Sequence, residues 1–345
     1  MGGQMDSLVF YYPEGHQKHY IFGHPERPER VQAIKEGLQE AGYWDSYPII
    51  PPLTPSERLL RSVHDREYLQ LLERASQKEQ MLDPDTYATR DSWQLALNAA
   101  GGALAVADRV WEGRAMAGFA LTRPPGHHAT RSRAMGFCLI NNAAVAAQYL
   151  LLEKGAERIA IIDLDLHHGN GTQDIFWERE DVIYVSIHQS PFYPGTGALY
   201  EVGEGPGEGA TLNLPIPALS GDRAYQSLLA EIILPYLDKT HPNMLLISFG
   251  FDIHWRDPLG SMQVSADCIF RMITELRNWA DGNCQGKIVV LLEGGYDLKA
   301  GKACGQAVSA GLLKAPWQDT LGSSPKSELD SWLETLREAK SLLGC

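Results

Sequence analysis

One stretch of this chain, residues 158–170, restricts the fold more than any other. It begins with the apolar run Ile159–Ile162, which is typical of a parallel strand buried on both faces. Asp163, Asp165 and His167 follow at every second position, and on an extended backbone that period directs all three side chains to one side. Open α/β sheets place their reactive groups at the carboxyl ends of such strands. The sequence therefore predicts an α/β sheet with a functional site at this edge.

A bound divalent cation is the natural reason to place two carboxylates and an imidazole together, because the cation offsets the repulsion between the acids. The alternative is a strand end with solvated acids, followed by a Gly-Asn-Gly turn at residues 169–171. A single acid at a strand end is usually of that kind. The pattern Asp-x-Asp-x-His-His-Gly-Asn-Gly is far more specific, so we predict a metal site here.

The composition excludes several classes of protein. With 44% hydrophobic and 21% charged residues, this chain of 345 residues can bury a large core and is not disordered. Its formal net charge of −13 argues against binding to nucleic acid, which requires a basic surface. No basic and apolar leader opens the chain, and no apolar run approaches the ~20 residues of a membrane span. We therefore expect a soluble, cytoplasmic protein that binds neither nucleic acid nor membranes.

The five cysteines are scattered, odd in number and without C-x-x-C spacing. They are Cys138, Cys268, Cys284, Cys304 and Cys345. Reduced thiols, most of them buried, are the simplest account of this pattern. The sequence leaves open whether the chain forms a homo-oligomer.

Six apolar segments are predicted to form β-strands, with helical stretches between them. They are Leu8–Tyr12, Ala117–Leu121, Ile159–Ile162, Val182–Ile187, Met244–Phe249 and Lys287–Leu292. Strands that alternate with helices over the whole length indicate one doubly wound parallel sheet. We therefore predict a single α/β domain over residues 1–345, which ends in a helix at about residues 328–343.

Other polar residues follow these strands and are expected at the same edge of the sheet. A rigid loop with two prolines and a glycine, residues 122–128, ends in the adjacent histidines His127 and His128. Held at this edge, two histidines suggest an acid–base pair or further metal ligands. Asp252 follows the fifth predicted strand, and two glycines after the sixth allow Tyr296 to swing over the sheet edge.

Two segments in the N-terminal part of the chain are interpreted as structural. The loop Gly23–Arg30 contains two arginines and two glutamates and is expected to be solvated and ion-paired, with Arg30 the one residue that could face inward. Ser62 is a predicted helix N-cap, with Asp65 three residues later. His64 is expected to be a packed or capping histidine rather than a ligand.

Six motifs of this chain, taken together and in order, resemble the zinc-dependent histone deacetylase superfamily, which includes acetoin-utilisation proteins and acetylpolyamine amidohydrolases. They are R-P-P-G-H-H (123–128), G-F-C-L-I-N-N (136–142), D-L-D-L-H-H-G-N-G-T (163–172), P-G-T-G (194–197), G-F-D (250–252) and L-E-G-G-Y (292–296). The resemblance spans roughly residues 8–312. The segment His24–Arg30 is similar to the class II branch, and the chain resembles its bacterial members.

The resemblance implies an arginase/deacetylase fold, in which one sheet of about eight parallel strands is flanked by helices. It also implies one catalytic zinc ion with Asp165, His167 and Asp252 as ligands, which leaves coordination positions for water and a substrate carbonyl. A structural potassium ion is implied as well. Its ligands would be Asp163, the Ser186 hydroxyl and the main-chain carbonyls of Asp165, His167 and Ile187.

The same resemblance assigns catalytic roles. His128 would be the general base that takes a proton from the attacking water, and its outer partner is Asn170, where some relatives have Asp. That replacement predicts a less basic imidazole. Asp163 would support His127, and the two histidines together would supply a proton to the leaving amine. Tyr296 would donate a hydrogen bond to the carbonyl oxygen as it becomes an oxyanion.

The resemblance further implies a tunnel for an acyl-lysine side chain. Its candidate substrate-binding residues are Gly136, Phe137, Tyr193, Leu259, Asp85, Gly294 and Gly295. Tyr193 departs from the usual Phe, and its hydroxyl would narrow the tunnel or bind an atypical acyl group. Leu259 favours acyl-lysine, because a polyamine-selective relative would place Glu there. Phe249 and Trp255 are further departures from the family pattern.

These residues favour an enzyme that hydrolyses acyl-lysine amides of peptides or proteins. The alternative within the same chemistry is a deacetylase for acetylpolyamines or other small acylated amines. A non-catalytic acyl-lysine binding protein is disfavoured, because a binder has no use for the base His128 and the donor Tyr296 beside a metal. An arginase-like dimetal hydrolase is also disfavoured, since only one ligand set is apparent. The sequence does not decide between Zn²⁺ and Fe²⁺, nor the length of the acyl chain.

Overall fold

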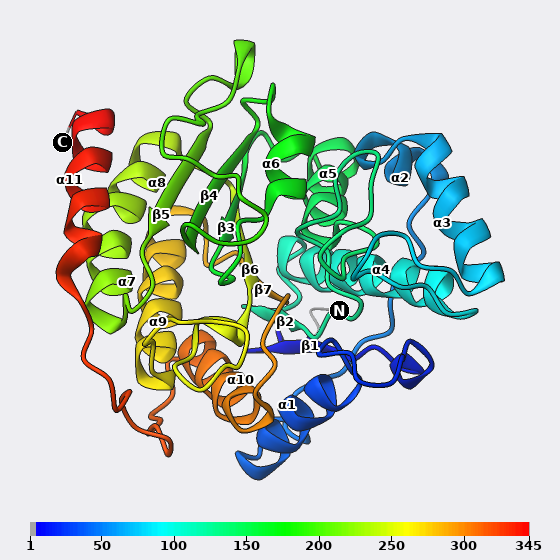
Figure 1. Ribbon diagram of the computed structural model, residues 1–345, viewed down its shortest axis with the longest axis horizontal. Helices are drawn as coiled ribbons and strands as arrows, with labels where there is room; N and C mark the ends of the chain where they lie inside the picture. The colour runs from blue at the N-terminus through cyan, green and yellow to red at the C-terminus, as the bar shows by residue number, and fades with distance from the viewer. Residues whose placement is uncertain (1–4, 345) are drawn as a thin grey trace.

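The computed structural model describes residues 5–344, which build one parallel seven-stranded sheet with helices on both of its faces (Figure 1). The strand order is β1-β2-β7-β6-β3-β4-β5. The strands are β1 Val9–Tyr11, β2 Gly118–Ala120, β3 Ile159–Asp163, β4 Val182–Gln189, β5 Thr211–Ile216, β6 Met244–Phe249 and β7 Ile288–Leu292. The predicted α/β fold is confirmed. Where the resemblance implied about eight strands, the described residues form seven.

One strand, β5, was not predicted from the sequence. It contains Pro215 and follows a glycine-rich acidic loop, residues 203–209, so its pattern is that of a turn region. β5 pairs with β4 alone and lies at the edge of the sheet. A proline, which cannot donate a ladder hydrogen bond, is tolerated on an edge strand.

The chain order places β3 in the middle of the sheet, between β4 and β6. From β3 the chain continues outward through β4 and β5 and then returns to the other side of β3 as β6. Asp163, the last residue of β3, is in register with Ser186 of β4 and Ser248 of β6. Open α/β sheets bind their ligands at such a switch point. The topology therefore brings the ends of β3, β4 and β6 together.

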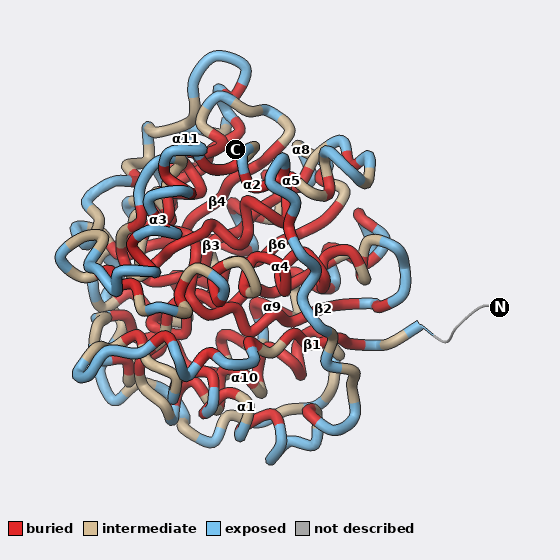
Figure 2. The backbone as a smooth tube through the Cα atoms, turned by 90° about the vertical axis from the view of Figure 1, so that its right-hand side faces the viewer, coloured by how far each residue is buried: buried red, intermediate tan, exposed pale blue. Residues whose placement is uncertain are grey.

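Two layers of helices cover the sheet and bury alternate residues of each strand (Figures 1 and 2). The helices are α1 Glu29–Glu40, α2 Glu57–Val63, α3 Arg66–Lys78, α4 Ser92–Trp111, α5 Asn142–Lys154, α6 Asn170–Phe176, α7 Asp222–Leu228, α8 Leu234–Thr240, α9 Ala266–Asn283, α10 Leu298–Leu313 and α11 Leu333–Leu343. Ala160 and Ile162 of β3 pack in the core beneath α1, α7, α9 and α10, whereas Ile159 and Ile161 pack in the core beneath α4 and α5. The strands are thus buried on both faces, as their apolar sequences predict.

The predicted helix boundary near Ser62 is wrong. Ser62 lies in the last turn of α2, and its hydroxyl donates to the Leu59 carbonyl oxygen. The helix predicted to begin there is α3, which begins at Arg66 with Asp65 as its N-cap residue. Ser56 is the N-cap of α2, and its hydroxyl oxygen accepts the Leu59 N–H at 3.1 Å. His64 is packed as expected, because its buried ring lies between the Thr130 carbonyl and the Asn141 N–H.

The cysteine and C-terminal predictions agree with the structure over the described residues. Cys138, Cys268, Cys284 and Cys304 are buried and form no disulfide, and Cys345 lies outside the described residues. The predicted terminal helix is present as α11 and begins at Leu333. Among residues 5–344, no helix combines the length and the apolarity needed to cross a membrane.

Candidate metal and catalytic site

The three predicted metal ligands converge at the carboxyl edge of the sheet. Asp165 and His167 follow β3, and Asp252 lies in the short turn after β6. Their ligand atoms all lie within 4.8 Å of one another. Nδ1 of His167 is 3.1 Å from Oδ1 of Asp165 and 3.3 Å from Oδ2 of Asp252. Both carboxylates are completely buried. The spacing in the sequence therefore becomes a compact group of one imidazole and two acids.

The donor set fits a divalent cation. Oδ2 of Asp252 is buried and accepts no hydrogen bond, which is unusual for a carboxylate unless another ligand takes its place. Burial and the charge of Asp165 raise the pKa of Asp252, so the two acids repel each other without a cation. Glycine backbone surrounds them, since a Cβ at Gly250 or Gly294 would lie 1.9 or 2.2 Å from a carboxylate oxygen. Two carboxylate oxygens and one imidazole nitrogen suit a catalytic zinc ion.

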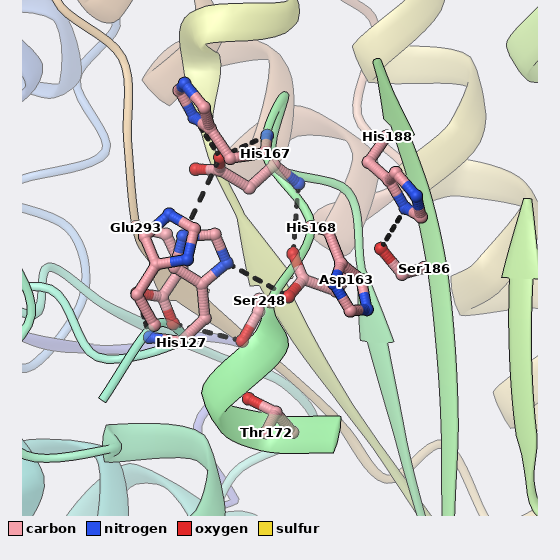
Figure 3. A network of polar contacts seen from close by, with 12 residues as sticks. His127, Asp163, His167, His168, Thr172, Ser186, His188, Ser248 and Glu293 are labelled. Carbon is pink, nitrogen blue, oxygen red and sulfur yellow. Dashed lines mark hydrogen bonds and ion pairs between the residues drawn. The ribbon is translucent and has the colours of Figure 1, made fainter. Parts of the chain in front are cut away.

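A second group of potential ligands lies nearby and consists of His127, Cys138 and Glu293. The carboxylate of Glu293 is already engaged: Oε2 accepts the N–H groups of Gly126 and His127 at 2.7 and 3.2 Å, and Oε1 accepts the Ser248 hydroxyl at 3.0 Å (Figure 3). These bonds fix the loop that carries the two histidines to β6. We therefore interpret this group as structural support for the loop, which sequence reasoning missed.

The adjacent histidines have opposite electrostatic environments. Burial lowers the pKa of His127, but the carboxylates of Asp165 and Asp163 more than compensate and raise it to about 10. Its Nδ1 is 3.1 Å from Asp163 Oδ2, and its Nε2 is 3.7 Å from Asp165 Oδ1. Burial and the neighbouring charges of His127 and His167 lower the pKa of His128. His127 is thus held charged and His128 neutral, which separates their acid–base roles.

His128 is oriented by the residue that the sequence singled out. Its Nδ1 lies 2.8 Å from Oδ1 of Asn170, at the start of α6. Because an amide oxygen can only accept, Nδ1 carries the proton and Nε2 keeps its lone pair. The Nε2 atom is therefore the basic nitrogen of His128.

The proposed potassium ligands lie side by side, as the strand register requires. Asp163 and Ser186 are paired residues of β3 and β4, and both are buried. Oδ1 of Asp163 accepts the Asp165 N–H, and the Ser186 hydroxyl lies 2.9 Å from Nδ1 of His188 (Figure 3). The carbonyl ligands, including that of Ile187, belong to the same two segments. The presence of a potassium ion stays a prediction.

Tyr296 lies over the site at the end of the loop that follows β7. Gly295 adopts a φ of 108°, and a Cβ there would meet the Phe251 backbone at 3.0 Å, so glycine is required. The Tyr296 ring is 8% exposed and meets Phe137 edge-on, with 6.0 Å between the ring centroids. Burial raises the pKa of the phenol, which therefore keeps its proton and can donate it in a hydrogen bond.

The loop Gly23–Arg30 is ion-paired as expected and partly exposed, but two of its charged side chains are buried rather than solvated. Glu26 and Arg30 are 0% and 2% exposed, and Arg30 does face inward. Its Nε and Nη2 donate to the carbonyls of Gly295 and Glu293 at 2.6 and 2.5 Å, and its guanidinium lies 4.8 Å from the Tyr296 ring centroid. Oε1 of Glu26 accepts from Nη1 of Arg30 at 2.9 Å. The contacts of Arg30 with the two carbonyls fix the segment that precedes Tyr296.

A cavity of about 240 Å³ joins these groups to the surface. It is lined by Asp85, Pro125, His127, His128, Gly136, Phe137, Cys138, His167, Phe192, Tyr193, Leu259, Gly294 and Tyr296. Six of the seven predicted substrate-binding residues are therefore on the lining, and Gly295, which packs against Phe251, is not. A larger cavity of about 650 Å³ beside α6 contains none of the catalytic groups, so the smaller one is the candidate active site.

The departures from the family pattern fall into two groups. Phe249 is buried in the core, and the indole of Trp255 donates to the Gly322 carbonyl, so neither lines the cavity. Tyr193 does line it, and its ring meets His128 edge-on at 5.2 Å. Phe192, which the sequence did not single out, stacks on His167 at 5.5 Å. The shape of the cavity is thus affected by Tyr193 alone among the three.

Comparisons with known proteins agree with this site. Residues 24–312 match the model of the histone deacetylase domain. The chain belongs to the histone deacetylase family. It is 41% identical over 278 residues to a probable deacetylase of Archaeoglobus fulgidus, covering 80% of this chain and 77% of that protein. It is 36% identical over 288 residues to a histone deacetylase-like amidohydrolase of Pseudomonas aeruginosa, covering 83% of this chain and 76% of that protein.

The same family is found among solved structures. The crystal structure of the HDA15 HD domain superposes with a TM-score of 0.89 at 36% identity, covering 98% of this chain and 95% of that one. Family membership supports a hydrolase of the deacetylase type. The cavity lined by His127, His128 and His167 is therefore the candidate site for that reaction.

Proposed function

We propose that this histone deacetylase family member is a zinc-dependent amidohydrolase that removes acyl groups from lysine side chains. One observation supports the proposal: the same cavity is lined by His128, Tyr296 and His167, and His167 groups with the buried Asp165 and Asp252 as potential metal ligands. An acyl amide at the end of this cavity would meet a base, a hydrogen-bond donor and a metal site at once.

A zinc ion held by Asp165, His167 and Asp252 would polarise the amide carbonyl and acidify the attacking water. The chain supplies the rest. His128 is neutral and oriented by Asn170, so its Nε2 can take the proton of the water. The same nitrogen then returns that proton to the leaving amine.

His127 has a supporting role in this proposal. Both of its ring nitrogens face carboxylates, and Nδ1 is within hydrogen-bond distance of Asp163. It therefore stays charged and, at 4.0 Å between ring centroids, keeps the pKa of His128 low. Tyr296 donates its hydrogen bond to the carbonyl oxygen as negative charge develops there. An oxyanion donor of this kind typically contributes ~10²–10³ in rate.

The walls of the cavity favour acyl-lysine as the substrate. Phe137, Tyr193 and Leu259 present apolar surface that suits the four methylenes of a lysine side chain. Leu259 supplies no carboxylate for a second ammonium group. Asp85 is the one acid on the lining outside the metal site, and it would accept hydrogen bonds from a peptide backbone. The Asp85 carboxylate could instead bind the second ammonium group of an acylated polyamine, and it therefore favours that alternative substrate.

The test measures hydrolysis of acyl-lysine peptides with a series of acyl groups and of N-acetylputrescine, with the zinc and iron content determined in the same sample. We expect turnover of acetyl-lysine peptides with a higher kcat/KM than for N-acetylputrescine. Leu259→Glu should shift the preference towards the polyamine, and Leu259→Met is the matched control that keeps the wall apolar. A strong preference of the wild type for N-acetylputrescine would overturn the substrate assignment.

We also propose that potassium binds between Asp163 and Ser186. A cation there would offset the charge of a completely buried carboxylate, whose pKa is raised by that burial. Melting temperatures in KCl should exceed those in an equal concentration of tetramethylammonium chloride. Equal melting temperatures would refute this cation.

A further inference from the structure

Tyr296 is placed on a segment that has little stiffness of its own. Two glycines precede it, and Gly295 has a φ that other residues rarely adopt. The proposed reaction needs the phenol at a fixed distance from the carbonyl oxygen, and an error of about 1 Å in such a position can cost ~10² in rate. Some other part of the chain must therefore hold Tyr296 in place.

Arg30 holds the segment before Tyr296, through the carbonyls of residues 293 and 295. The segment after it is held by the carboxylate of Asp257. Oδ2 of Asp257 accepts the N–H of Tyr296 at 2.6 Å and the N–H of Asp297 at 3.1 Å. Asp297 in turn caps α10 by accepting the Ala300 N–H at 2.8 Å. The backbone on the C-terminal side of the tyrosine is thus tied to two fixed points.

The other oxygen of Asp257 accepts a hydrogen bond from the backbone of a residue that lines the cavity. Oδ1 accepts the N–H of Leu259 at 3.0 Å. Leu259 and Tyr296 both line the cavity, so one carboxylate sets the position of the phenol relative to the wall that receives the substrate. Asp257 itself is not on the lining, and it is 6% exposed.

The surroundings of Asp257 disfavour the charged form of its side chain. Burial and the charge of Asp252 raise the pKa of Asp257 to about 7. The three backbone N–H groups that donate to the Asp257 carboxylate offset part of that cost.

We propose that Asp257 is a positioning residue for catalysis, which fixes Tyr296 and Leu259 relative to each other through their backbone N–H groups. The inference rests on the proposed function of Tyr296 as the oxyanion donor. Asp257→Asn keeps the shape but replaces one acceptor oxygen with an NH₂ group, so one side of the arrangement loses its acceptor. We expect kcat to fall by about 10- to 100-fold, as for other residues that orient reacting groups, while KM changes by less than about threefold.

The decisive test is a double-mutant cycle with Tyr296→Phe, measured under single-turnover conditions with an acetyl-lysine peptide. If Asp257 acts through the phenol, Asp257→Asn should have little further effect once the hydroxyl is gone, and the double variant should match Tyr296→Phe within about twofold. If Asp257 only stabilises the fold, the two losses multiply. Multiplied losses overturn the inference.

Asp222→Asn is the matched control. Asp222 also accepts a backbone N–H and a hydroxyl, both from Ser265, at 2.7 Å each, but neither residue lines the cavity. It should lower the melting temperature with kcat unchanged. If Asp257→Asn does not fold, Asp257→Glu, which keeps the charge and shifts it by one methylene, replaces it in the double-mutant cycle. Non-additive losses with Tyr296→Phe then support the inference, and multiplied losses overturn it.

The wild type and Tyr296→Phe separate this inference from the proposed function. Absence of acyl-amide hydrolysis by the wild type, or equal rates for the wild type and Tyr296→Phe, refutes the proposed function. A slow Tyr296→Phe variant combined with multiplied losses refutes only the role of Asp257.

Discussion

The Glu26→Gln variant should lose about 4 kcal/mol of unfolding free energy, because it leaves two buried guanidinium groups without their counter-charge. Oε1 of Glu26 accepts from Arg123 at 2.7 Å and from Arg30 at 2.9 Å, and Oε2 accepts from Arg123 at 3.0 Å. All three side chains are at most 2% exposed. Removing one partner of a buried ion pair typically costs about 3–5 kcal/mol, since the remaining charge stays buried.

The pKa of Glu26 gives an independent magnitude. Burial acts to raise this pKa, but Arg123 and Arg30 more than compensate and lower it from 4.5 to about 2. A depressed carboxyl pKa of that size corresponds to about 3 kcal/mol of stability. This contribution is fully present above pH 4.5 and is lost as the pH falls through about 2. The difference in stability between the wild type and Glu26→Gln should therefore shrink over that range.

The expected change in melting temperature follows from the size of the chain. Unfolding entropies near about 2.1 cal/mol/K per residue give roughly 0.7 kcal/mol/K for 345 residues. A loss of about 4 kcal/mol then lowers the melting temperature by about 5–6 °C. Circular dichroism melts at pH 7 measure this shift, and repeating them between pH 5 and pH 3 follows its decline.

Glu40→Gln is the control for this measurement. Glu40 binds Lys302 at 2.8 Å, but the two side chains are 59% and 33% exposed. An exposed pair contributes at most about 1 kcal/mol, which corresponds to a shift of roughly 1–2 °C. If Glu26→Gln melts within that same interval of the wild type, the three buried side chains do not depend on each other's charge, and the reasoning is refuted.

Three further predictions concern the reaction. Tyr296→Phe should lower kcat by about 10²–10³ with KM nearly unchanged, and a variant with normal kcat would show that the phenol is not the oxyanion donor. Asn170→Asp places a carboxylate against Nδ1 of His128, so the pKa of His128 should rise by about 1–3 pH units. The acid limb of the kcat/KM profile reports loss of the neutral base, and it should move to higher pH by that amount; an unmoved limb would exclude His128 as the base. Removal of the metal with a chelator should abolish turnover and lower the melting temperature, because a cation that binds only the folded chain stabilises it; re-addition of zinc should restore both, and turnover by a metal-free sample would refute the mechanism.

Local periodicity made the centre of the site predictable. Asp163, Asp165 and His167 alternate with leucines, and an extended backbone directs alternate residues to one side whatever the rest of the chain does. The apolar runs of the strands predicted a doubly buried sheet in the same way. Asp252 and Tyr296 could be expected near this edge, because in parallel sheets all carboxyl ends meet there.

The groups that hold the site together were decided only by the tertiary structure. Glu26, Arg30 and Glu293 come from segments up to 267 positions apart. The sequence indicated a solvated Glu26, left the direction of Arg30 open and assigned no role to Glu293, yet their burial makes them partners of the catalytic loops. The edge strand β5 was hidden by its proline, whose missing N–H is harmless only at an edge.

The contrast has a physical reason. Which side of a strand a residue faces is a property of neighbouring residues, so the alternation of Asp163, Asp165 and His167 already specifies it. Whether a charged residue such as Glu26 is solvated or buried depends on which distant groups arrive to compensate its charge, and only the folded chain determines that.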